Sequence, residues 1–106
     1  MSSIPTSEQI IDAGANGASV VLSNCLSTHP RKPGYCTHTY QKQVANQVGD
    51  SVAELYLNNG IPMLNNGSIE AARKAHDAIV QCNFSKVQDR QSANRVAEHC
   101  LRQSFK

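Results

Sequence analysis

Four cysteines are the side chains of this sequence best suited to chemistry. They are Cys25, Cys36, Cys82 and Cys100, in a chain of 106 residues that contains no tryptophan. An even number of cysteines in so small a chain favours a domain cross-linked by disulfides in an oxidising compartment. Free structural thiols and a metal site are the two alternatives. We predict disulfides, and with them a protein that works outside the cytosol.

The metal alternative depends on the series Cys25-x3-His29-x6-Cys36-x-His38, which offers four possible ligands within fourteen residues. Structural zinc sites usually separate the two ligands of each pair by two to four residues. Here the second pair is separated by a single residue, so the spacing departs from that pattern. No CxxC motif is present either, which argues against a thioredoxin-like redox site. We therefore predict no metal and no cofactor.

Two disulfides could connect these cysteines in three ways. Cys25 near the end of one predicted helix and Cys36 just before the next would close a short, proline-rich loop. Cys82–Cys100 then follows by elimination, but it meets a difficulty. A helix running unbroken from residue 85 would carry Cys100 roughly 22 Å along its axis, whereas bridged Cα atoms lie within about 7 Å. A later start, near Ser92, would remove the conflict.

The other reactive side chains do not form a recognisable catalytic set. The sequence lacks a phosphate-binding glycine loop, an HExxH motif and a nucleophile elbow. Glu98, His99 and Cys100 are consecutive and would point about 100° apart on a helix. His76 lies on an apolar stripe, typical of a core or boundary histidine, and its neighbour Asp77 is expected on a different side. We predict no catalytic residue and no enzymatic activity.

The elements that must position these residues are helices. Apolar residues recur three or four positions apart in four segments, and no strand-like alternation competes with them. We predict helices over 7–26, 39–58, 69–81 and 85–104. Short joints between four helices favour an antiparallel four-helix bundle. The prediction is a single all-α domain over residues 1–106, cross-linked by disulfides.

Capping residues mark the predicted helix starts. Thr6 and Gln9 have the spacing of a capping box, in which each side chain satisfies a free backbone donor of the other. Ser85 and Gln88 have the same spacing, and Ser68 is a good N-cap for the third helix.

Glycines mark two further features of the predicted bundle. Gly14 and Gly17 lie on the apolar stripe of the first helix, where each costs roughly 1 kcal/mol relative to alanine. Close approach of a neighbouring helix would compensate, and a homodimer through Gly14, Gly17 and Ala18 is also possible. Gly60, just past the second helix, fits the left-handed position that often ends a helix.

Two joints between helices carry the candidate contacts with a partner. The first, residues 27–37, contains an adjacent basic pair and a tyrosine. The second contains the tetrapeptide Ile-Pro-Met-Leu between two Asn-Asn-Gly triplets, which either closes the open end of the core or is exposed to a partner. The candidate partner-binding residues are Arg31, Lys32, Tyr35, Ile61, Met63 and Leu64.

Charge and hydropathy narrow the class of protein. Ten Lys and Arg against eight Asp and Glu are too few positive charges for nonspecific nucleic-acid binding. No run approaches the roughly 20 apolar residues of a membrane span. Residues 1–24 contain no Lys or Arg and lack the pattern of a signal peptide. If the protein is exported, we expect this sequence to be its mature form, with Met1 supplied by cloning.

These patterns lead to a functional expectation. We expect a small exported domain, periplasmic or secreted and of bacterial type, that binds a protein partner; it is similar in size and layout to immunity proteins that neutralise a toxin. An accessory component of a secretion or conjugation machine fits as well. A helical domain that binds a small ligand or metal through His29, His38 or His76 is a further alternative, and a cytosolic regulator would instead carry four free thiols.

Overall fold

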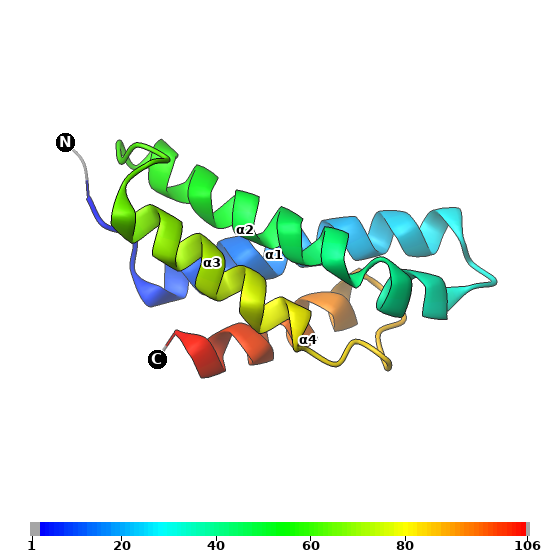
Figure 1. Ribbon diagram of the computed structural model, residues 1–106. Coiled ribbons are helices and arrows are strands. Elements are labelled where there is room, and N and C mark those ends of the chain that lie inside the picture. The colour runs from blue at the N-terminus through cyan, green and yellow to red at the C-terminus, as the bar shows by residue number, and fades with distance from the viewer. Residues whose placement is uncertain (1–2, 106) are drawn as a thin grey trace.

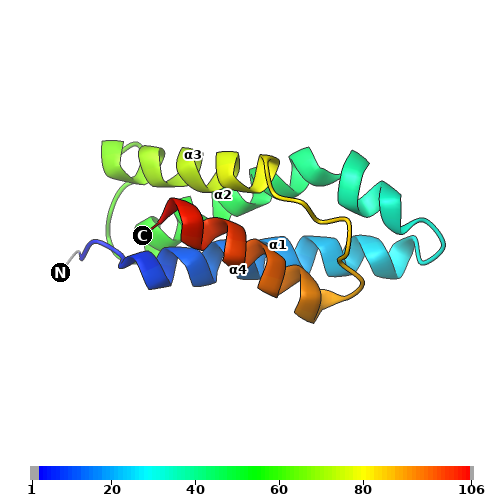
Figure 2. The same cartoon turned by 90° about the horizontal axis from the view of Figure 1, so that it is seen from below.

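A computed structural model describes residues 3–105. Every element of regular secondary structure within this range is a helix. The elements are α1 (Ser7–Thr28), the π-helix η1 (Tyr35–Thr39), α2 (Gln41–Asn58), α3 (Asn66–Val80) and α4 (Arg90–Ser104). Consecutive α-helices run in opposite directions and form an elongated bundle of 47 × 24 × 19 Å (Figure 1). α2 packs against α1 and α3, and α4 lies along α1 (Figure 2). The predicted all-α bundle is confirmed.

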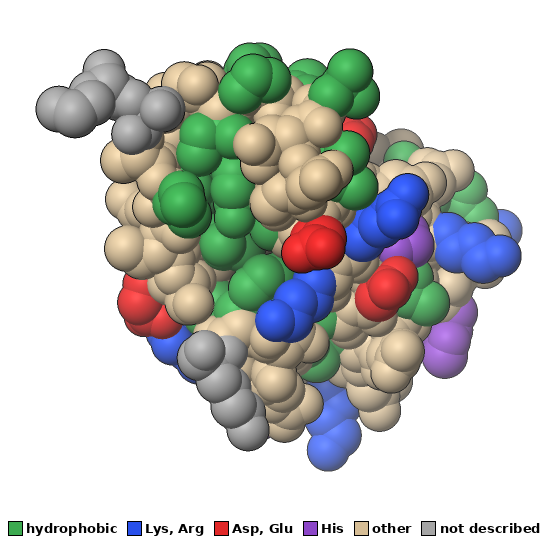
Figure 3. All heavy atoms as spheres, turned by 60° about the vertical axis from the view of Figure 1, so that its left-hand side comes forward, with side chains coloured by type: hydrophobic (Ala, Val, Ile, Leu, Met, Phe, Trp, Pro, Cys, Tyr) green, Lys and Arg blue, Asp and Glu red, His purple; other side chains and the backbone are tan. Residues whose placement is uncertain are grey.

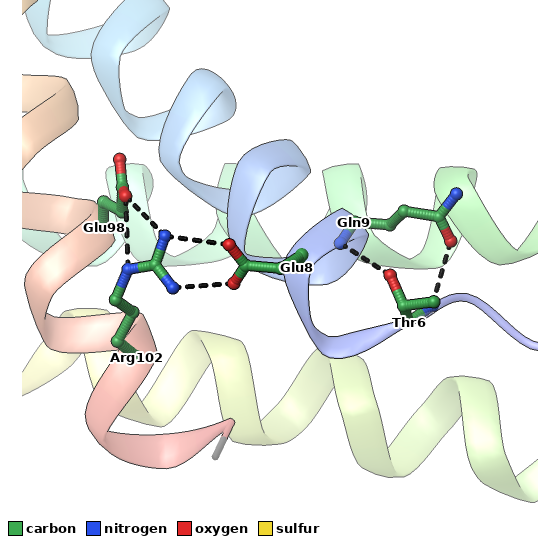
Figure 4. A network of polar contacts seen from close by, with 5 residues as sticks. All are labelled: Thr6, Glu8, Gln9, Glu98 and Arg102. Carbon is green, nitrogen blue, oxygen red and sulfur yellow. Dashed lines mark hydrogen bonds and ion pairs between the residues drawn. The ribbon is translucent and has the colours of Figure 1, made fainter.

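The start of α1 follows the predicted capping box. The Thr6 amide donates to Oε1 of Gln9 at 2.9 Å, and the Gln9 amide donates to Oγ1 of Thr6 at 3.1 Å (Figure 4). The same close-up shows that this turn is tied to α4. Arg102 donates to both carboxylate oxygens of Glu8, at 2.6 and 3.0 Å, and also to Glu98. The guanidinium lowers the pKa of the Glu8 carboxyl below its ordinary value.

The two stripe glycines of α1 lie where helices approach closely, as predicted. A Cβ on Gly14 would stand 2.8 Å from Cδ1 of Leu101 in α4, and one on Gly17 would stand 2.5 Å from Oγ of Ser51 in α2. Gly14, Gly17 and Ala18 are all buried within the chain. This face is therefore packed within the bundle, between α1 and the helices α2 and α4.

The second helix begins two residues later than predicted. Residues 35–39 form a π-helix, in which the Tyr40 amide donates to the Tyr35 carbonyl at 3.0 Å, and the α-helix begins at Gln41. Its side-chain amide donates to the carbonyls of residues 79, 80 and 82, at 2.7–2.9 Å. Gln41 thus fastens the start of α2 to the end of α3. At the other end of α2, Gly60 has φ 83°, as predicted.

The third helix begins three residues earlier than predicted. Its N-cap is Asn65, whose side-chain oxygen accepts from the amides of Gly67 at 2.9 Å and Ser68 at 3.4 Å. Asparagine and serine are equally good N-caps. Asn65 is the cap here because its backbone is extended and its side chain reaches the free amides of the first turn. Ser68, predicted as the cap, is fully buried in the first turn of α3 instead.

The fourth helix begins at Arg90, five residues later than predicted. Asp89 is its N-cap and forms a capping box with Ser92: the Ser92 amide donates to Oδ1 of Asp89 at 2.8 Å. Residues 81–89 form a joint instead of a helix, with Phe84 and Val87 both buried, each 2% exposed. The predicted capping box at Ser85 is not formed: the Ser85 amide donates to Oδ1 of Asn83 at 2.9 Å, and the Gln88 amide donates to Oγ of Ser92 at 3.0 Å.

A single hydrophobic core runs along the bundle. Its largest fully buried apolar side chains come from all four α-helices and from the joint before α4: Ile11, Leu22, Val44, Val48, Val52, Ile79, Phe84 and Leu101. Because this core occupies the middle of an elongated molecule, the two ends are covered mainly by loops and helix termini. The candidate contact residues lie at these ends.

Candidate partner-binding surfaces

All four cysteines are paired, in the connectivity predicted. Cys25 bonds to Cys36 with a Cα–Cα distance of 5.8 Å, and Cys82 bonds to Cys100 with 5.9 Å. The later start of α4 makes the second bridge possible, since Cys82 lies in the joint beside the helix that carries Cys100. The predicted alternative of a Cys–His metal set loses both of its sulfur ligands to the first disulfide.

The histidines make local contacts. The His29 ring lies 4.8 Å from the ring of Tyr35. Nδ1 of His76 lies 3.1 Å from Oδ1 of Asp77, so the expectation that these neighbours point apart is wrong: both side chains lie at the surface, where rotation about their side-chain bonds lets them meet. Among residues 3–105, no group of three or more His, Cys, Asp or Glu side chains could hold a metal ion.

One end of the molecule is formed by residues 25–40, which we call the tip. It consists of the last turn of α1, the following loop and η1, and it projects beyond α3 and α4 in both views (Figures 1 and 2). Arg31, Lys32 and Tyr35 are exposed here. The tip therefore presents the first predicted group of contact residues to solvent.

A cleft of about 380 Å³ opens beside the tip. It is lined by Val21, Asn24, Cys25, Thr28, His29, Tyr35 and Tyr40. The rings of Tyr35 and Tyr40 are 6.1 Å apart, so three aromatic side chains in sequence order form one wall. Sequence spacing alone does not identify His29 and Tyr40 as partners of Tyr35. The π-helix places Tyr40, five residues after Tyr35, on the same side of the chain.

The opposite end, where α1 begins and α2 ends, carries exposed apolar side chains. The Ser3 amide donates to the Asn59 carbonyl at 3.3 Å, which places the first described residues beside the joint after α2. The exposed large apolar side chains of this end are Ile4, Leu57, Met63 and Leu64, and we call them the apolar end. Figure 3 shows apolar side chains gathered over this face of the molecule.

The second predicted group is divided by the structure. Met63 is 52% exposed and Leu64 is 87% exposed, whereas Ile61 is only 9% exposed and belongs to the core. Ile61 therefore closes the open end of the bundle, and its two neighbours along the chain face solvent. Ile4 and Leu57 were missed, although both are large apolar residues that stand outside the stripes assigned to the core.

The six predicted contact residues do not form one site. Three lie on the tip and the others belong to the end that carries the apolar side chains, at opposite ends of a molecule 47 Å long. One partner of ordinary size would have to span the whole bundle to reach both. The tip and the apolar end are therefore two separate candidate surfaces.

Comparisons with known proteins place no constraint on this assignment. No protein-family model, no curated protein and no solved structure matches the chain. Within residues 3–105, no helix combines the length and the apolar character needed to cross a bilayer. The disulfides and the two end surfaces are therefore the features from which a function can be proposed.

Proposed function

We propose that this chain is a small exported domain, periplasmic or secreted, that acts by binding a protein partner, as a toxin-neutralising immunity protein does. The observation that carries the proposal is the apolar end. Exposing large apolar side chains to water costs free energy, and a group of exposed apolar side chains on a small bundle is typical of a protein-binding surface. Leu64, at 87% exposed, is the extreme case.

The disulfides support the compartment in this proposal. Both pairs are formed and no cysteine is free, a state that persists outside the reducing cytosol. The test is the mass of the protein isolated from its native source after thiol alkylation without reductant. We expect no alkylated cysteine. Four alkylated thiols would contradict export and favour a cytosolic role.

The partner-binding role is tested at the apolar end. We would immobilise the wild-type protein and a Met63→Ser/Leu64→Ser variant, and compare the proteins each retains from an extract of its native compartment. Val80→Ser is the matched control, because Val80 is also an exposed apolar residue, 41% exposed, at the far end of α3. We expect one protein to be retained by wild type and by the control, and lost by the double variant.

Retention of the same proteins by all three would overturn the assignment of the apolar end. The substituted side chains of the joint are exposed, so replacing them leaves the core intact and the result reports on the surface. Gene neighbourhood separates the first two candidate roles: a toxin gene adjacent to this one supports immunity.

An accessory component of a secretion or conjugation machine is the second candidate. The observation that favours it is the separation of the two surfaces along the 47 Å length of the bundle, which suits a component held between two neighbours. If this is its role, the tip and the apolar end bind different proteins, and a transfer operon surrounds the gene. Capture experiments with each end altered separately would then lose different partners.

A further inference from the structure

The charge on the tip is of one sign. From Ala13 to Gly49 the sequence contains no Asp or Glu, and the charged residues of this segment are Arg31, Lys32 and Lys42. The ion pairs among residues 3–105 involve Arg102 and His76, and none involves Arg31 or Lys32. Both cations of the basic pair therefore remain available to an anionic group from outside.

The basic pair stands next to the aromatic cleft. Arg31 and Lys32 follow His29 by two and three residues, and the ring of His29 lies 4.8 Å from that of Tyr35. The cleft of about 380 Å³ behind these rings is also lined by Asn24 and Thr28. A volume of this size admits one or two side chains of a ligand, and its wall combines aromatic faces with polar groups. Charge and cavity are thus combined on one end of the protein.

The disulfide gives the tip a defined shape. Between Cys25 and Cys36 no side chain is buried, so packing does little to hold this loop, and the bridge fastens it to α1. A loop held in one conformation loses less entropy on binding than a free one. An exposed, cross-linked loop that carries charge is therefore suited to recognition.

The number of cations indicates which anion fits. A protein that binds nucleic acid through phosphates typically makes 6–10 such contacts, and a basic segment that holds an anionic membrane typically clusters 4–8 Lys and Arg. The segment 13–49 has three. Two or three carboxylates can be matched by this number, and Arg31 can receive one of them with two parallel hydrogen bonds.

We propose that the tip binds an acidic segment of a protein partner. Carboxylates of the segment pair with Arg31 and Lys32, and an aromatic or apolar side chain beside them enters the cleft next to Tyr35. The proposal rests on the role as a protein-binding domain and names the chemistry of one partner surface. It uses the opposite end of the molecule from Met63 and Leu64.

The test uses purified protein and two labelled peptides. One is a short peptide of alternating Glu and Tyr, and the other is its counterpart with Gln in place of each Glu. Binding is followed by fluorescence anisotropy at low and at physiological salt. We expect the Glu peptide to bind at least about tenfold more tightly than the Gln peptide, with an affinity that falls as salt is added.

Charge reversal at the tip is compared with an equal reversal elsewhere. Arg31→Glu/Lys32→Glu should weaken binding of the Glu peptide by about tenfold or more, and the neutral Arg31→Gln/Lys32→Gln variant by less. Arg73→Glu/Arg90→Glu is the control: it changes net charge by the same amount at exposed positions of α3 and α4, and the affinity should stay within about twofold. Tyr35→Ala should weaken both peptides by the same factor, since its contact is with the cleft side chain.

Several results would overturn the proposal. These are equal binding of the two peptides, no binding of the Glu peptide at millimolar concentration, or an equal loss in the control variant. Tighter binding of single-stranded DNA or of anionic lipid vesicles under the same conditions would also overturn it, and would identify a different class of partner. None of these outcomes depends on the capture experiment with Met63 and Leu64, so the two proposals fail separately.

Discussion

Two cross-linked segments of this protein are closed by similar disulfides and held in opposite ways. Cys25–Cys36 and Cys82–Cys100 join residues 11 and 18 positions apart, and their Cα–Cα distances differ by only 0.1 Å. No side chain between Cys25 and Cys36 is buried. Between Cys82 and Cys100 four apolar side chains are buried: Phe84, Val87, Ala93 and Ala97.

The difference shows what each disulfide does. The segment after Cys82 is fixed both by the bridge and by its own packing into the core, so it is part of the cooperative structure. The loop between Cys25 and Cys36 depends mainly on the bridge and on local backbone hydrogen bonds, and most of its side chains are exposed and free for contact with other molecules. One disulfide reinforces the core, and the other shapes a surface.

The largest expected effect comes from removing the packing of the second segment. Phe84 is 2% exposed, and Phe84→Ala should lower the free energy of unfolding by about 3–5 kcal/mol, because a large cavity is left in the core. Denaturant titration measures it. Tyr35→Ala, at the exposed tip, should cost less than about 1 kcal/mol. Equal losses would show that the tip is as well packed as the joint before α4.

Removing each disulfide separately gives the next largest effect. Chain entropy predicts about 3 kcal/mol for a loop of either length. The Cys82→Ala/Cys100→Ala variant should lose about this amount of its free energy of unfolding, because packing keeps its segment in place. The Cys25→Ala/Cys36→Ala variant should lose less, because without the bridge the tip can open locally in the native state and regain conformational entropy there.

Amide hydrogen exchange distinguishes the two responses. Without Cys25–Cys36, exchange should accelerate in residues 26–40 and change little in α3 and α4. Without Cys82–Cys100, exchange should accelerate across the bundle as its overall stability falls. A uniform acceleration in both variants would contradict the comparison.

The pH dependence of the two segments should differ as well. Hydrogen bonds from the backbone and side chain of Ser92 lower the pKa of Asp89 below its ordinary value. A lowered folded-state pKa contributes stability that is present above the unfolded value of about 4 and is lost as the pH falls through the folded pKa. Glu8, whose pKa is lowered by Arg102, acts in the same direction. The tip segment, which lacks carboxylates, contributes no such loss.

Asp89→Asn tests this contribution. Asparagine is a comparable N-cap and does not titrate, so the variant should melt slightly below wild type at pH 7, and the gap should close or reverse at pH 3. Thermal melts at the two pH values measure it. A gap that stays constant would show that the Asp89 carboxylate does not contribute to the acid response.

The smallest expected effect is a gain at the tip. Gly34 has φ −62°, and a Cβ there would meet nothing within 4 Å. Gly34→Ala should therefore raise the free energy of unfolding by about 0.4–1 kcal/mol, by restricting the unfolded chain. Gly14→Ala is the contrast, and should lower it by about 1–3 kcal/mol because its Cβ would meet Leu101. A loss at Gly34 would mean that the tip is more tightly packed than the structure shows.

Much of the fold was predictable because local signals were unambiguous. The Thr6–Gln9 capping box has no competitor nearby, and the helical periodicity of α1 and α2 is supported by many residues. The signals failed where two were equivalent. Both Ser85 and Asp89 can cap a helix, and the sequence alone does not show which of them does. In the folded chain Asp89 and Ser92 form the capping box, and the Gln88 amide donates to Oγ of Ser92 and not to Ser85.

The types of residue on the candidate surfaces were predictable from the sequence, but their positions in the folded molecule were not. A basic pair near a tyrosine and an apolar tetrapeptide are visible in the chain itself. That Ile61 turns inward while Leu64 turns outward depends on how the joint crosses the end of α2. That Gln41 reaches three carbonyls at the end of α3 likewise depends on contacts between distant segments.

The sequence by itself therefore determined the helical class, the glycine contacts of α1, the Cys25–Cys36 bridge and the absence of acidic residues from the segment 13–49. Periodicity, loop length and local charge are properties of neighbouring residues, so they can be read from the chain alone. Only the tertiary structure decided that α4 begins at Arg90, which makes the Cys82–Cys100 bridge possible, and that the basic and apolar contact residues lie at opposite ends of the bundle. The burial of a side chain and the distance between residues remote in the sequence are set only when the helices pack. These two quantities decide whether a residue lies on a surface that can bind a partner or in a core that cannot.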